Sequence, residues 1–374
     1  MKEQSTLTSD SKFTEFLDSY KEPLLLFLIS RVLFFALIFA SGSTYRELLY
    51  GFDGEHYIRI ATEGYKLDAL KAFFPMVPLL IKFIGVYGTA ILNNICFAVS
   101  LCLMKNITDK KENRTLILLL LALSPVSFFS IIAYTESLFF LLTLGAYILY
   151  TKRKNPLLMG VLIGLSVFTR NTGSIVFFAV FIGMCIDWKN KKTTFKDICT
   201  AYVPATLISL IFPVFLQIRY GNWKYFMDVQ KPYWSKISSN FFKTLLIEFR
   251  VLFTDYYKYD GMDFTFLNKL NEIYTLGITA VFIYLIVCEI RKRKNADIVS
   301  AAVLVLTLLI ITTTIRNPLY DAPTVSFFRY YLVMFPAYTL LRDKKEKTVL
   351  VITAASVFLS VFAAYFFAKG VFFF

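Results

Sequence analysis

The sequence predicts an all-α membrane protein, a polytopic bundle of about eleven transmembrane helices. Of its 374 residues, 57% are hydrophobic and 18% aromatic, and the mean hydropathy of +0.60 lies far outside the range of soluble domains. Continuous apolar runs at 23–41, 297–315 and 348–368 approach or reach the roughly 20 residues that a bilayer-spanning helix needs. Continuous runs, as opposed to alternating apolar residues, indicate helices and not a barrel.

The positive charge is concentrated in short segments between apolar runs. The chain has a net charge of +14, and five such segments hold 19 of its 40 Lys and Arg residues. This is the pattern of cytoplasmic loops and not of a nucleic-acid-binding face. The five segments are 105–114, 152–155, 187–197, 291–297 and 342–347.

If these segments are cytoplasmic, they fix on which side of the membrane the remaining connections lie. The tail 1–22 is also cytoplasmic, and the spans lie near 24–41, 79–104, 115–133, 137–151, 156–170, 172–187, 198–218, 272–290, 297–315, 327–341 and 348–368. The outer face then receives the first outer loop 42–72, the breaks 133–137 and 169–173, the long loop 219–271, the segment 316–330 and the C-terminal end. We therefore expect a single integral-membrane domain over 1–374, with loop helices around an outward-opening cavity.

Several other classes of protein lack support in the sequence. About twenty mixed polar residues precede the first apolar run and no small-x-small cleavage site follows it, so we expect a permanent helix and not a cleaved signal peptide. The five cysteines have no C-x-x-C spacing, which argues against disulfides and a thiolate metal site. No motif of nucleotide-driven transport or of the common hydrolases is present.

Acidic and basic groups are concentrated directly after the first span, in "FDGEHYIRIATEGY" (52–65). Asp53 and Glu55 form a D-x-E pair, and His56, the single histidine, adjoins them. A partly desolvated carboxylate at a membrane surface can serve as a general base. The alternative is an ordinary solvated loop.

Further charged residues occur at the outer ends of predicted spans. Glu136 lies in "YTESLFF", Arg170 and Asn171 in "FTRNTG", and Arg329 and Tyr330 in "SFFRYYLVMFP". Ionisable groups in such places usually pair or bind a ligand, and the guanidinium fork suits a phosphate. Snorkelling of the arginines toward lipid headgroups is the alternative.

The long outer loop carries a group of aromatic residues in "GNWKYFMDVQKPYW" (221–234). Trp234 with Gln230 is a combination of an aromatic face and an amide that commonly holds a sugar, although Trp and Tyr are also usual at membrane interfaces. The prolines Pro75 and Pro78 are interpreted as a structural bend.

Several motifs, taken together and in order from about residue 50 to 340, resemble the PIG-V family, GPI mannosyltransferase II and its prokaryotic relatives. They are "FDGEHYIRIATEGY", "AFFPMVPLL", "SPVSFFSIIAYTESLF", "LMGVLIGLSVFTRNTG" and "SFFRYYLVMFP". The resemblance implies a GT-C-type glycosyltransferase that takes a sugar from a polyprenyl- or dolichyl-phosphate donor at the outer or lumenal face. In such families an acid of the first outer loop is the presumed base, which matches Asp53, while Phe52 stands where the family usually has Trp.

The implied mechanism is an inverting single displacement, in which Asp53 accepts the proton of the acceptor hydroxyl. Arg170 and Arg329 are the candidates to stabilise the departing phosphate, and Glu55, His56, Glu136, Asn171, Gln230, Trp234 and Tyr330 complete the expected substrate-binding set. No obligatory metal is expected, and Asp53 with Glu55 is the pair that would bind a divalent ion.

The expected partners are a polyprenyl-phosphate sugar donor, which the resemblance implies is mannosyl, a lipid or glycan acceptor and membrane lipids, without nucleic acid. A small membrane subunit is left open. The location would be the plasma membrane in a prokaryote or the endoplasmic reticulum in a eukaryote. Three alternatives stay open: transfer of another sugar, a lipid or glycan transporter, and a non-catalytic lipid-binding subunit. The ionisable residues lie mostly at outer ends of spans, whereas transporter sites lie near the midplane, which favours the enzyme.

Overall fold

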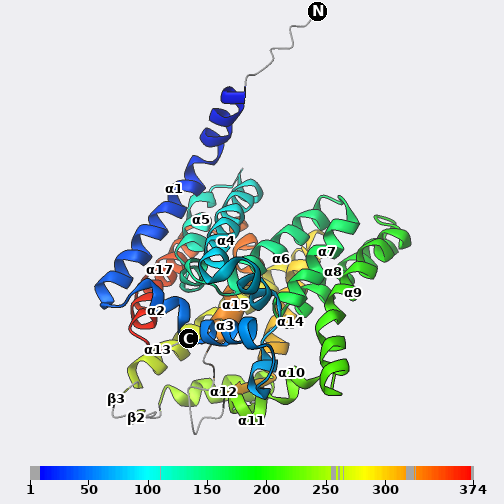
Figure 1. Ribbon diagram of the computed structural model, residues 1–374. Helices are drawn as coiled ribbons and strands as arrows, with labels where there is room; N and C mark the ends of the chain where they lie inside the picture. Colours follow the sequence, from blue (N-terminus) through cyan, green and yellow to red (C-terminus); the bar gives the residue numbers. More distant parts are fainter. Residues whose placement is uncertain are drawn as a thin grey trace, which may run out of the picture.

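The computed structural model describes residues 9–109, 111–253, 258–259, 262–263, 265–316, 324 and 326–371, and the described chain is almost entirely helical (Figure 1). The α-helices are α1 (Ser9–Ser41), α2 (Tyr45–Tyr50), α3 (Asp53–Glu63), α4 (Met76–Thr108), α5 (Arg114–Ala122), α6 (Glu136–Thr151), α7 (Pro156–Thr169), α8 (Gly173–Lys189), α9 (Phe195–Tyr220), α10 (Tyr225–Asp228), α11 (Gln230–Trp234), α12 (Phe241–Val251), α13 (Thr265–Arg291), α14 (Ile298–Ile311), α15 (Phe327–Leu332), α16 (Pro336–Thr339) and α17 (Glu346–Ala368). Short 3₁₀ helices are η1 (Asp68–Ala72), η2 (Pro125–Ile131), η3 (Arg293–Asn295) and η4 (Leu341–Asp343), and the strands are β1 (Lys236–Ser238), β2 (Lys258–Tyr259), β3 (Met262–Asp263) and β4 (Thr314–Arg316).

Within the described residues, five helices are long and apolar enough to cross a membrane, and a sixth span results if α5 and η2, bent by 59°, are counted as one. The five are Asp18–Ser41 in α1, α4, α9, Phe266–Arg291 in α13, and α17. The protein is thus an all-α membrane protein as predicted, but the predicted eleven spans are not confirmed. Three further apolar helices, α6, α7 and α14, have 16, 14 and 14 residues, and at 1.5 Å per residue they fall short of the roughly 30 Å hydrocarbon core.

The segment expected to span near 327–341 is not a continuous helix. It folds as α15, a turn, and α16 with Pro336 at its first position. Proline fits the first turn of a helix but has no N–H to continue one from before. Most residues of this segment are buried in the protein core, which explains why its sequence is so apolar.

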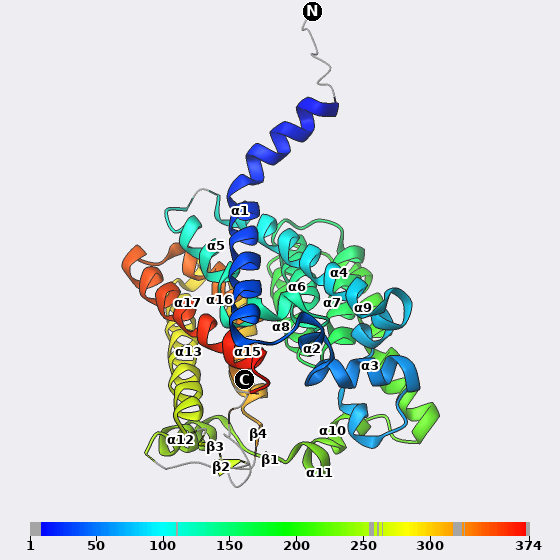
Figure 2. The same ribbon diagram turned by 60° about the vertical axis from the view of Figure 1, so that its left-hand side comes forward.

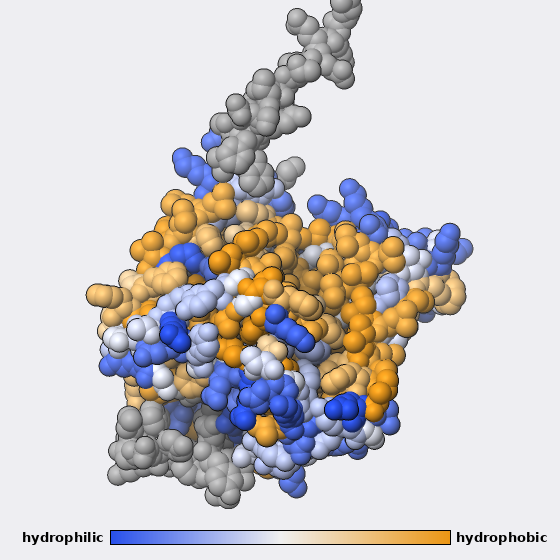
Figure 3. Space-filling view, in the orientation of Figure 1, coloured by the Kyte–Doolittle hydropathy of each residue, from blue (hydrophilic) through white to orange (hydrophobic). Residues whose placement is uncertain are grey.

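The two ends of the bundle carry different segments of the chain. The connections with the basic segments lie at the end where α1 begins, whereas α10, α11, α12 and β1 lie at the opposite end (Figures 1 and 2). Ion pairs join the basic segments to one another, as from Lys111 Nζ to Asp343 Oδ1 (2.7 Å) and from Arg153 to Asp187 (3.9 Å). Hydrophobic residues cover much of the surface between these two ends of the bundle. Hydrophilic residues lie along the upper edge and toward the lower end of the view in Figure 3.

The first connection after α1 folds into two short helices that position Asp53. Thr44 and Glu47 form a reciprocal cap at the start of α2, which satisfies backbone N–H groups left open by the first turn. Between α2 and α3 the chain bends so tightly that a Cβ on Gly54 would lie 2.5 Å from the carbonyl oxygen of Leu49. Asp53 is therefore held in the first turn of α3, where the helix dipole favours a carboxylate.

Helices α7 and α9 pack closely through small residues. A Cβ on Gly160 would lie 1.9 Å from the backbone oxygen of Ala201, and one on Gly164 would lie 2.8 Å from the Cβ of Ile208. Small residues four positions apart let two helix backbones approach within a membrane. This contact fixes the C-terminal end of α7, where Arg170 follows.

We predict that Gly160→Ala lowers the melting temperature of the purified protein, because overpacking of a close contact costs about 1–3 kcal/mol. The matched control is Gly277→Ala on α13, where a Cβ meets nothing within 4 Å; Ala is the better helix former there. Thermal unfolding in detergent measures both. Equal melting temperatures for the two variants would contradict the proposed close packing.

Candidate functional site

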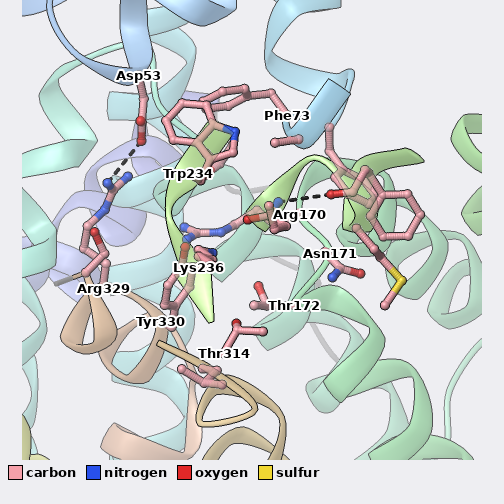
Figure 4. Close-up of a pocket in the computed structure, with 18 of the residues that line it drawn as sticks. Asp53, Phe73, Arg170, Asn171, Thr172, Trp234, Lys236, Thr314, Arg329 and Tyr330 are labelled. Atoms are coloured by element: carbon pink, nitrogen blue, oxygen red, sulfur yellow. Dashed lines mark hydrogen bonds and ion pairs between the residues drawn. The ribbon is translucent and has the colours of Figure 1, made fainter. Parts of the chain in front are cut away.

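A cavity of about 410 Å³ lies near the end opposite the basic segments, and Figure 4 shows its lining. Its volume falls within the roughly 300–1,000 Å³ that is usual for small-molecule sites. Aromatic and aliphatic side chains form part of the wall, and polar and charged groups form the rest. The apolar part includes Phe73, Phe74, Phe226, Ile310, Ile311 and Phe327.

A chain of ion pairs underlies the polar wall. Arg329 Nη1 donates to Asp53 Oδ2 at 3.1 Å, and Arg329 Nη2 and Nε donate to Glu136 Oε1 at 2.7 and 3.1 Å. Arg170 Nη1 donates to the same Glu136 oxygen at 2.9 Å. Glu136 and Arg329 are only 3% and 4% exposed, so these charges depend on one another for compensation.

The four residues of this network come from four separate elements. Asp53 starts α3, Glu136 is the first residue of α6, Arg170 directly follows α7, and Arg329 lies in α15. The N-terminal positions of both carboxylates are favourable for a negative charge. Aromatic faces complete the setting of Arg329, whose guanidinium carbon lies 4.4 Å from the ring centre of Phe129.

The pKa directions agree with this network. Burial by itself would raise the pKa of the Glu136 carboxyl, but Arg329 and Arg170 lower it to about 2. Burial would also raise the pKa of the Tyr330 hydroxyl, yet Lys236, Arg170 and Arg329 outweigh it and lower that pKa below its usual value. Tyr330 therefore reports a positive potential at its side of the cavity.

The structure brings most of the sequence-predicted site residues to one cavity. Those that line it are Asp53, Arg170, Asn171, Gln230, Trp234, Arg329 and Tyr330. Trp234 is fixed there by a hydrogen bond from its indole N–H to the carbonyl of Ala69 (3.3 Å) and by edge-to-face packing on Phe73.

Three predicted residues do not line the cavity. Glu136 lies beneath its wall and holds the two arginines. Glu55 is exposed, and two residues along a helix from Asp53 its carboxylate points in a different direction. His56 packs against the rings of Phe73 and Trp234, with centroids at 5.0 and 5.4 Å. Within the described residues no group of three or more His, Cys, Asp or Glu side chains is placed to hold a metal ion.

Lys236 and Arg316 also line the cavity, although the sequence did not predict them as site residues. They lie on β1 and β4, which pair in an antiparallel ribbon. Strands of three residues carry almost no periodic signal, and 80 residues separate the two positions. The position of Lys236 two residues after Trp234 was the one local signal available.

Comparison with known families gives one match. The family model described as glycosyltransferase family 87 matches residues 69–313. No curated protein and no solved structure matches the chain. The match confirms the predicted glycosyltransferase, but it does not confirm the resemblance to the PIG-V family in particular. Asp53 and Arg329 lie outside the matched residues.

We predict that Glu136→Gln lowers the free energy of unfolding by about 3–5 kcal/mol, because it leaves the buried guanidinium of Arg329 and the largely buried one of Arg170 with a single carboxylate. Thermal unfolding in detergent measures the loss. Glu63→Gln on α3 is the control, since Glu63 forms only an exposed pair with Arg59 (3.5 Å), which contributes little. An unchanged melting temperature for Glu136→Gln would contradict this role of the network.

Wild type and Glu136→Gln also test how the stabilisation by Glu136 depends on pH. Because the pKa of Glu136 is lowered to about 2 in the folded state, its contribution is full above the unfolded value of about 4.3 and is lost as the pH falls toward 2. The difference in the free energy of unfolding between wild type and Glu136→Gln should be constant from about pH 8 to 5 and should become smaller below that range. A gap that changes between these two values would show that another group titrates.

Proposed function

The chain belongs to glycosyltransferase family 87, and from this premise we propose that it transfers a mannosyl residue from a polyprenyl-phosphate donor to a lipid or glycan acceptor. The observation that supports this most directly is the carboxylate of Asp53 on the wall of the cavity, bound on one side by Arg329. The donor and acceptor would meet in this cavity at the extracytoplasmic face, because the basic segments lie at the opposite end of the bundle. In a prokaryotic cell that face belongs to the plasma membrane.

Asp53 is placed to act as the base. Arg329 binds its Oδ2 atom and so orients the carboxylate, while among the described residues Oδ1 accepts no hydrogen bond. In the proposed step the acceptor hydroxyl oxygen attacks the anomeric carbon and its proton passes to Oδ1. The bond from that carbon to the phosphate oxygen breaks, its electron pair leaves with the phosphate, and the configuration at the carbon inverts.

Arg170 and Arg329 take a different part in this proposal from the one expected from sequence. Both already bind carboxylates, Arg170 to Glu136 and Arg329 to Glu136 and Asp53. Their charges are therefore largely offset. We assign them to hold Asp53 in place, and the stabilisation of the leaving phosphate needs further cations.

The remaining wall divides into two parts that suit a lipid-linked sugar. Trp234 offers a fixed aromatic face with Gln230 beside it on α11, and such faces commonly hold sugar rings. The apolar residues of α14 and α15 offer a surface for the first isoprene units. A transporter would use a similar bundle, but family membership favours the transferase.

We predict that Asp53→Asn reduces transfer about 100- to 10,000-fold, the usual contribution of a general base. The assay incubates purified protein with labelled polyprenyl-phosphate-mannose and membrane lipids and identifies the labelled product. Glu63→Gln on the same helix is the control and should retain activity. Near-normal transfer by folded Asp53→Asn would remove Asp53 from this role. If the wild-type protein transfers only from a polyprenyl-phosphate carrying a different sugar, the proposed mannosyl donor is wrong.

A further inference from the structure

A second cavity, of about 210 Å³, lies at the end of the bundle that carries the basic segments, where the turn between α6 and α7 meets the turn between α8 and α9. This volume is smaller than the roughly 300–1,000 Å³ of sites that enclose a whole small molecule. The cavity therefore suits one polar group of a larger molecule. The charged side chains that line it are Arg153, Lys154, Asp187, Lys192 and Asp197.

Positive charge predominates in the two turns. The segments 152–155 and 187–197 together hold seven Lys and Arg residues against two Asp residues. Hydrophilic residues gather over the upper ends of α7, α8 and α9 in the common orientation of Figures 1 and 3. An anion near this cavity would therefore be attracted by the surplus of cations.

The two carboxylates of the cavity already have partners. Asp197 Oδ2 accepts hydrogen bonds from the backbone N–H and the hydroxyl of Thr194 at 3.0 and 2.7 Å, which caps the start of α9. Asp187 Oδ2 accepts a hydrogen bond from the hydroxyl of Tyr150 at 3.1 Å. These contacts hold the ends of the helices in place and leave little of either carboxylate for the cations.

The cations of the cavity have donor capacity left. Arg153 Nη2 lies 3.9 Å from Asp187 Oδ2, which is beyond hydrogen-bonding distance. In the part of the chain that the structure describes, no carboxylate lies within ion-pair distance of Lys154 or Lys192. Both lysines are exposed at the mouth of the cavity.

Other basic segments offset their charge with carboxylates. Lys292 Nζ lies 2.6 Å from Glu289 Oε1, and Arg114 Nε lies 2.9 Å from Glu22 Oε2. An excess of Lys and Arg on one side of a membrane protein is common, but it does not by itself leave such residues unpaired around a cavity. The unpaired lysines distinguish the second cavity from these segments.

Aromatic and aliphatic side chains place this cavity at the level of the lipid headgroups. Trp188 and Phe195 are both more than half exposed and contact each other, with ring centroids 5.7 Å apart. Exposed tryptophan is typical of the membrane–water interface. Leu157 and Leu158, which directly follow Pro156 of the cavity lining, are also exposed. An apolar surface for lipid chains thus begins beside the cations.

We propose that Arg153, Lys154 and Lys192 bind the phosphate group of an anionic phospholipid, in the leaflet at this end of the bundle. The guanidinium fork and the two ammonium groups suit a phosphate, and basic pockets between helices at the cytoplasmic side of membrane proteins bind anionic headgroups. The exposed leucines at the start of α7 would contact the acyl chains. This site is independent of the sugar that the protein transfers.

The bound lipid would bridge elements that also form the first cavity. Helix α6 begins with Glu136 and ends beside the second cavity, whereas α7 begins beside the second cavity and ends before Arg170. A ligand that binds only the folded state stabilises it. We therefore expect the lipid to raise the melting temperature of the whole bundle.

The test measures lipid binding and not transfer. Dioleoyl-phosphatidylglycerol is titrated into the purified full-length protein in mixed micelles with a neutral detergent, and the dissociation constant and the thermal shift are recorded. The double variant Lys154→Gln/Lys192→Gln should bind about tenfold more weakly or less, since each lysine near an anionic lipid contributes substantially. The double variant Lys154→Arg/Lys192→Arg should retain binding.

The matched control is Lys345→Gln/Lys347→Gln, which removes the same charge from another basic segment. Both of these lysines are exposed and do not line the cavity, so the control should bind the lipid as wild type does. Without lipid, Lys154→Gln/Lys192→Gln should melt at the wild-type temperature, because neither lysine has an ion pair to lose. Equal weakening in the two glutamine variants would show a diffuse surface charge and overturn the site.

Two further ligands identify what is recognised. Dioleoyl-phosphatidylcholine, which has no net charge, should bind much more weakly, and equal affinity for the two lipids would overturn recognition of an anion. Glycerol 3-phosphate, a soluble phosphate, should also bind much more weakly, and equal affinity for it would overturn the assignment to a lipid. Loss of transfer by Asp53→Asn with normal lipid binding supports both proposals, whereas normal transfer with normal lipid binding removes only Asp53 as the base.

Discussion

The carboxylate of Glu136 is the group on which the site depends. It is buried at the start of α6 and accepts hydrogen bonds from both Arg170 and Arg329 through one oxygen. Without it the buried guanidinium of Arg329 and the partly buried one of Arg170 would lack sufficient negative charge nearby, which would destabilise the folded state. Because Arg329 also binds Asp53, the orientation of the proposed base is set by a residue that does not itself line the cavity.

This network also pairs the two arginines of the cavity wall with carboxylates. Arg170 and Arg329 face the cavity but are bound to carboxylates, so they hold the wall together. Lys236 and Arg316 also line the cavity and belong to the antiparallel ribbon of β1 and β4 (Figure 4 labels Lys236). The cavity is thereby divided into a carboxylate held by arginines and an aromatic and aliphatic wall suited to a lipid-linked sugar.

The apolar runs and basic segments predicted the class of fold well, because hydrophobicity and charge act locally. They did not predict the number of spans. The runs near 137–151 and 156–170 are apolar because they are buried within the protein, as α6 and α7, and are shorter than a bilayer requires. The run near 327–341 is apolar for the same reason, yet it is broken into α15 and α16.

The sequence by itself determined that this is a helical membrane protein, with its basic residues between apolar runs and with Asp53, Arg170 and Arg329 as candidates for chemistry. Tertiary structure alone decided that Glu136 lies beneath the wall, that Glu55 and His56 do not line the cavity, and that Lys236 pairs with Arg316 across the ribbon. The physical reason is distance along the chain. Periodicity reports the few residues around a position, whereas these contacts join elements that only packing of the whole bundle brings together.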